Sequence, residues 1–61
     1  MTIREMMIDW MIHNDLGYRV TPTDESYQHQ YKYYDAKSDE ELFDEFKSDV
    51  YREGRDSMSY Y

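Results

Sequence analysis

The apolar residues near the N-terminus recur at helical spacing and occupy more than one face of a helix. One stripe consists of residues three and four positions apart, namely Ile3, Met6, Met7, Trp10 and Met11. Ile8 and Ile12 lie well outside that stripe, one turn apart from each other. A helix that is apolar over so wide an arc is either central in its fold or shared with a second surface.

Two arrangements would cover both faces of this helix. In the first, the middle of the chain and a second helix pack on either side of it. In the second, Ile8 and Ile12 are a possible oligomer contact and the protein is a homodimer. The chain has 61 residues and no Cys, so its core is small and no disulfide supports it.

The predicted bounds of this first helix are about 3–14. Thr2 and Glu5 have the spacing of a capping box, in which a hydroxyl and a carboxylate bind free backbone N–H groups of the first turn. Gly17 follows the apolar stripe and suits a left-handed residue at the end of the helix.

Residues 18–34 fit two secondary structures. Tyr residues in the second half of this segment alternate with Gln and Lys, which is the period of a strand. Tyr27, Tyr31 and Tyr34 also match helical spacing, and Pro22 would open a helix at its first position. Because Tyr favours strands, we predict a two-stranded antiparallel hairpin that packs on the helices.

A second amphipathic helix is predicted over residues 39–53. Ser38 and Glu41 repeat the capping-box spacing, and Gly54 is expected to end the helix. Its apolar stripe consists of Leu42, Phe43, Phe46 and Val50.

The predicted fold class is therefore α+β, with two amphipathic helices packed against a hairpin. An all-α fold of three helices is the alternative. We expect one small domain over residues 1–54 and a flexible C-terminal tail over residues 55–61.

The formal net charge of −7 limits the partners of the chain. Surfaces that bind phosphates or anionic membranes are built from Lys and Arg, so we expect no direct binding to nucleic acid and none to membranes. An acidic protein is instead steered toward basic surfaces. The expected partner is a protein with a basic nucleic-acid-binding surface, of the nuclease or polymerase class.

The N-terminal segment lacks the pattern of a signal peptide, and no run of about 20 apolar residues occurs. We therefore expect a soluble, cytoplasmic protein.

Residues for catalysis are scarce. His13 and His29 are the only imidazoles and lie on separate predicted elements, and the two glycines, Gly17 and Gly54, are too few for a phosphate-binding loop. We expect a protein that is not an enzyme, with no catalytic residue, no cofactor and no metal site.

Carboxylates crowd the second helix on the side opposite its apolar stripe. They are Glu40, Glu41, Asp44, Glu45 and Asp49. Like charges one turn apart cost a few tenths of a kcal/mol per pair, so this row of carboxylates needs an explanation. One reason is solubility. The other is imitation of a nucleic-acid backbone, which makes the row a partner-binding surface.

Eight Tyr in so short a chain exceed what a small core can bury. Tyr is enriched at the centres of interfaces, because it covers much area at a low cost in entropy. We therefore add Tyr27, Tyr31, Tyr34 and Tyr51 to the predicted partner-binding residues. The alternative is that Tyr replaces Phe in a thin core, where each hydroxyl reaches water.

In its size, lack of Cys, Tyr content and acidic run Asp39–Glu45, the chain resembles the small acidic proteins that phages use against host machinery. Anti-CRISPR proteins and inhibitors that mimic DNA are of this kind. The resemblance implies a stoichiometric inhibitor in the cytoplasm of a bacterial host, with a Cas nuclease as the leading target class. The alternative function is a small module for oligomerisation, or for binding a transcription regulator, that uses the apolar first helix.

Overall fold

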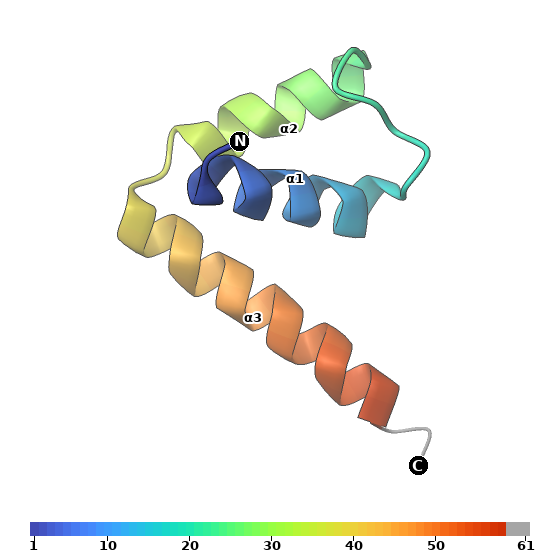
Figure 1. The fold of residues 1–61 in the computed structure, drawn as a ribbon, viewed down its shortest axis with the longest axis vertical. Helices are drawn as coiled ribbons and strands as arrows, with labels where there is room; N and C mark the ends of the chain where they lie inside the picture. Colours follow the sequence, from blue (N-terminus) through green and yellow to red (C-terminus); the bar gives the residue numbers. More distant parts are fainter. Residues whose placement is uncertain (59–61) are drawn as a thin grey trace.

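The computed structural model describes the backbone of residues 1–58 and the side chains of residues 1–53. The described residues form three helices, α1 (Ile3–Leu16), α2 (Glu25–Asp35) and α3 (Asp39–Met58) (Figure 1). α1 lies between the other two and packs against both, whereas α2 and α3 make far fewer contacts with each other. None of the described helices combines the length and the apolar character needed to cross a bilayer.

The core is built around α1, as the wide apolar arc of that helix predicts. Three of its residues, Ile8, Met11 and Ile12, are buried against Tyr27 of α2 and Leu42 of α3. Ile8 and Ile12 have no exposed surface at all. They are core residues, so the alternative in which they form an oligomer contact does not fit their position.

The prediction of a hairpin over residues 18–34 is wrong, because no strand occurs within residues 1–58. The second half of that segment is α2, and the fold is the all-α alternative of three helices. A helix satisfies its own backbone groups, whereas an isolated hairpin is marginal in water. Helical spacing also turns Tyr27, Tyr31 and Tyr34 toward the core, where Tyr27 is buried and the other two are half-buried.

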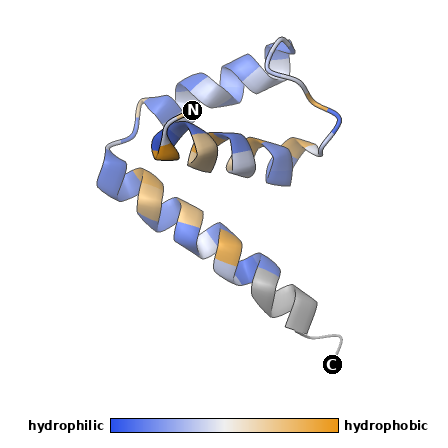
Figure 2. Cartoon of the chain, in the orientation of Figure 1, coloured by the Kyte–Doolittle hydropathy of each residue, from blue (hydrophilic) through white to orange (hydrophobic). Residues whose placement is uncertain are grey.

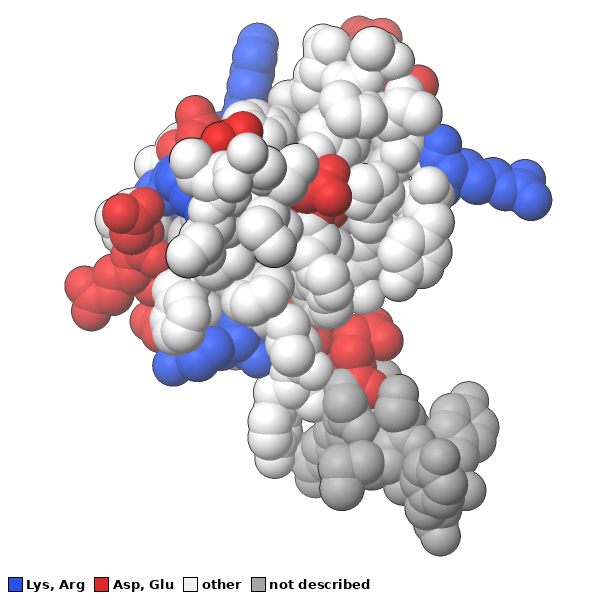
Figure 3. All heavy atoms as spheres, viewed as in Figure 1, with Lys and Arg blue, Asp and Glu red and all other residues white. Residues whose placement is uncertain are grey.

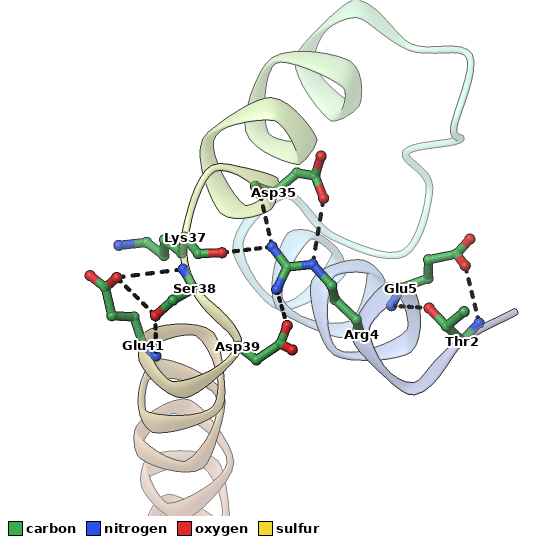
Figure 4. Close-up of polar contacts among 8 residues, drawn as sticks. All are labelled: Thr2, Arg4, Glu5, Asp35, Lys37, Ser38, Asp39 and Glu41. Carbon is green, nitrogen blue, oxygen red and sulfur yellow. Dashed lines mark hydrogen bonds and ion pairs between the residues drawn. The ribbon is translucent and has the colours of Figure 1, made fainter.

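Both predicted capping boxes are present (Figure 4). The backbone N–H of Glu5 donates to the Thr2 hydroxyl, and the backbone N–H of Thr2 donates to the Glu5 carboxylate, each over 3.1 Å. Ser38 and Glu41 repeat this exchange at the start of α3. These hydrogen bonds hold the pKa of both glutamates below the usual value, since they favour the charged carboxylate.

The ends of the helices differ from the prediction. α1 continues to Leu16 and is closed by Gly17, whose φ of +95° is costly for any other residue. α3 runs through Gly54 to Met58, so it is longer than the predicted 39–53. A glycine inside a helix costs only about 1 kcal/mol, which neighbouring residues can offset. Of the predicted tail 55–61, residues 55–58 are helical and residues 59–61 lie outside the described part.

Arg4 ties the beginning of α1 to the connection between α2 and α3 (Figure 4). Its guanidinium donates to the carbonyl oxygens of Asp35 and Lys37 over 2.8 and 2.7 Å, and to the carboxylate of Asp39. Its Nε lies 3.5 Å from the Asp35 carboxylate. A planar fork with five N–H donors can serve all these acceptors at once, which a lysine ammonium cannot.

Replacement of Arg4 by Lys tests this fork at constant net charge. Arg4→Lys should lower the free energy of unfolding by about 1–2 kcal/mol, because a lysine ammonium cannot make all of these hydrogen bonds at once. The matched control is Arg19→Lys in an exposed loop, which should change it by less than about 0.5 kcal/mol. Urea unfolding followed by circular dichroism measures both. Equal effects of the two substitutions would contradict the role given to Arg4.

A second polar contact joins α1 to α2. The Tyr27 hydroxyl donates to the Asp9 carboxylate over 2.6 Å. The ring nitrogens of His13 lie 3.0 Å from the Asp9 carbonyl oxygen and 3.1 Å from that of Val20, in the loop before α2. Burial, and then the hydrogen bond to Asp9, raise the pKa of Tyr27 to about 12.

The raised pKa of Tyr27 predicts a late step in an alkaline titration. The neutral phenol stabilises the fold below pH of about 10, and this contribution is lost as the pH rises toward about 12. Tyrosinate absorbance should therefore show a last step near pH 12 that Tyr27→Phe removes. Tyr18→Phe, at an exposed position of the loop, should leave this step in place.

Candidate protein-binding surface

Most of the α3 side chains that the structure describes, within residues 39–53, are exposed. The helix crosses α1 near its own first half, and its second half runs away from α1 and α2 (Figure 1). Only Leu42 of its apolar stripe is fully buried. Phe43 and Tyr51 keep 49% and 70% of their surface exposed, and Val50 is exposed as well. Much of the apolar surface of α3 therefore faces solvent.

The predicted row of carboxylates is divided between two sides of α3. Glu45 and Asp49 are half-buried on the side that faces α2. Glu45 lies 3.3 Å from the Lys37 ammonium, which raises the pKa of Lys37. Burial raises the pKa of Tyr34 too, and the nearby Glu45 and Asp49 add to this effect. Glu45 is thus held by an ion pair of the fold, and both carboxylates are less accessible than an exposed binding row requires.

The other three carboxylates point to solvent. Glu41 is exposed but belongs to the capping box, and Asp44 lies 3.6 Å from the Lys47 ammonium. Glu40 has no ion-pair partner among the described side chains. On the face drawn in Figure 3, carboxylates alternate with Lys and Arg side chains and with uncharged surface. The row that the sequence suggests is thus shorter than expected and partly neutralised.

Three of the four tyrosines predicted to bind a partner belong to the core instead. Tyr27 is 6% exposed, and Tyr31 and Tyr34 pack against the buried cluster. The ring of Tyr31 stacks on that of Tyr27 with 6.2 Å between centroids. Tyr thus replaces Phe in a thin core, which was the alternative interpretation. Only Tyr51 lies on the surface, as predicted.

The structure places apolar residues of the predicted α3 stripe beside Tyr51. Phe43, Phe46, Val50 and Tyr51 line a shallow hollow on α3, bordered by Asp44 and Lys47. In Figure 2 the apolar positions of α3 recur along the helix between polar ones. The ring of Trp10 in α1 packs edge to face against that of Phe46, with 5.5 Å between centroids. α1 therefore contacts one of the residues that line the hollow. Three of these residues occur at i, i+3 and i+7, a spacing visible in the sequence.

A second apolar area lies at the beginning of α1. Met1, Ile3 and Met6 are largely exposed there, although the sequence pattern places Ile3 and Met6 in the main apolar stripe. The core is centred on Ile8, Met11 and Ile12 between α2 and α3, and Ile3 and Met6 lie outside it.

The chain matches no protein-family model, and no curated protein or solved structure is similar to it at the level of significance required. The resemblance to small acidic inhibitors therefore depends on size, charge and composition alone.

The division of the acidic row predicts unequal effects of charge reversal. Glu45→Lys removes the ion pair with Lys37 and should lower the free energy of unfolding by about 1–2 kcal/mol. Glu40→Lys changes the charge equally but should cost only about 0.5 kcal/mol, the size of a helix-dipole effect. Urea unfolding compares the two. If they are equally destabilising, Glu45 is not a structural residue.

Proposed function

We propose that the protein is a stoichiometric inhibitor that binds a basic nucleic-acid-binding surface of a host enzyme. A Cas nuclease is the leading target class, and the bacterial cytoplasm is the place of action. The observation that carries the proposal is the exposed side of α3, where Glu40 and Asp44 lie in line with Tyr51. These positions, spaced i, i+4 and i+11, share one side of a helix.

The charge of the whole chain supports a basic partner. A net charge of −7 accelerates the approach to a surface rich in Lys and Arg, and salt weakens this effect. With Glu45 and Asp49 turned toward α2, the carboxylates of α3 do not reproduce a long row of phosphates. In this proposal, charge steers the protein to its target, and exposed aromatic surface provides much of the contact.

Capture of partners from a bacterial lysate on the immobilised protein tests the proposal. We expect a basic nucleic-acid enzyme to be retained at low salt and to be released by about 1 M NaCl, where charges are screened beyond about 3 Å. Recovery of only acidic or neutral proteins would contradict the proposal.

Two matched variants then locate the contact. Glu40→Lys should slow association with the captured enzyme about tenfold at low salt, because it reverses a charge at the interface. Glu25→Lys makes the same change at the beginning of α2, far from α3 along the chain, and should have a much smaller effect. Association rates measured by surface plasmon resonance decide this point, and equal slowing would mean that only total charge matters.

A second candidate is a small module that oligomerises or binds a transcription regulator through α1. Ile8 and Ile12 are buried, so such a module would use Ile3 and Met6, which are exposed. Light scattering separates the candidates, since Ile3→Asp would break an assembly formed there and would leave the inhibitor monomeric.

A further inference from the structure

Three residues of α3 form a ridge that its own chain leaves partly uncovered. Phe43, Phe46 and Val50 are spaced i, i+3 and i+7, so they lie along one side of the helix. Phe46 is half-buried against Trp10, while Phe43 and Val50 are exposed. This is the pattern by which an amphipathic helix packs against a second helix or into a groove. We call Phe43, Phe46 and Val50 the α3 ridge.

Carboxylates border the α3 ridge on both sides. On one side are Glu40 and Asp44, and on the other is Glu53, one turn beyond Val50; all three are exposed. Lys47 lies over the Phe43 ring at 5.2 Å and is 3.6 Å from Asp44, so its charge is compensated within the face. An apolar ridge between carboxylates is complementary to an apolar strip between Lys or Arg side chains.

We infer that the α3 ridge binds an amphipathic, cationic helix of the target protein. The apolar face of that helix packs on Phe43, Phe46 and Val50, and its Lys or Arg side chains meet Glu40, Asp44 and Glu53. A second copy of the chain fits less well, because it would bring the same carboxylates and another net charge of −7 to the contact. The inference rests on the proposed function and names the feature of the partner that α3 recognises.

Two synthetic peptides separate apolar recognition from charge. One is an amphipathic Leu/Lys peptide of about fourteen residues, close to four helical turns. The other is an oligolysine with the same number of Lys residues. In spectra of the isotopically labelled protein, the Leu/Lys peptide should shift the amide signals of Phe43, Phe46 and Val50. Release of the Leu/Lys peptide should need a higher NaCl concentration than release of oligolysine, because salt screens charges but does not weaken apolar contact.

The substitution Val50→Asp sharpens the test, because it adds negative charge while it removes apolar surface. Electrostatics alone predicts tighter binding of the cationic peptide, whereas apolar recognition predicts an affinity about tenfold weaker. Ile3→Asp makes the same change in the apolar area of α1 and should leave the affinity unchanged. Circular dichroism checks that both variants fold. The amide shifts are measured on the unaltered protein, so they locate the binding site even if a variant does not fold.

Three outcomes would overturn the inference. The Leu/Lys peptide shifts residues around Ile3 and Met6 instead of the α3 ridge. Alternatively, the two peptides bind equally and are released by the same salt. Finally, light scattering finds a dimer that Val50→Asp breaks, which assigns the ridge to a second copy. The first two results leave lysate capture of a basic enzyme untouched, so they separate failure of this inference from failure of the proposed function.

Discussion

The burial of α1 from two sides is the constraint on which the rest of this structure depends. Ile8 and Ile12 have no exposed surface because α2 and α3 both pack against α1 around them. In a chain of 61 residues, α2 and α3 used in this way make few contacts with each other. The apolar surface of α3 that results is a by-product of enclosing α1, and it is also the surface available to a partner.

Most acidic side chains with a known contact stabilise the fold. Glu5 and Glu41 close capping boxes, Asp9 accepts the Tyr27 hydroxyl, and Glu45 pairs with Lys37. Net charge thus overstates the charge that is free for a partner. The acidic composition can still steer association, because long-range fields depend on the sum of charges and not on their local pairing.

Local features could be predicted from the sequence, and features set by distant contacts could not. Capping boxes depend on residues three positions apart, so Thr2 and Ser38 were assigned correctly. Tyr alternation fits a strand and a helix alike, and only packing against α1 selects the helix. The helical spacing of the carboxylates says which of them share a side, but not that Glu45 pairs with Lys37 in the α2–α3 connection. The contacts of Arg4 join residues more than thirty positions apart, and no local pattern indicates them.

The choice of acceptors by Arg4 has a consequence for how this sequence can vary. Two of its hydrogen bonds end on carbonyl oxygens, at Asp35 and Lys37, which every amino acid carries. These two hydrogen bonds therefore demand a particular residue only at position 4, whereas the contacts of Arg4 with the carboxylates of Asp35 and Asp39 also depend on those side chains. The side chain at residue 37 is left free for other work, here the ion pair with Glu45. Residue 37 can therefore be replaced without loss of its hydrogen bond with Arg4, as long as Arg4 is kept.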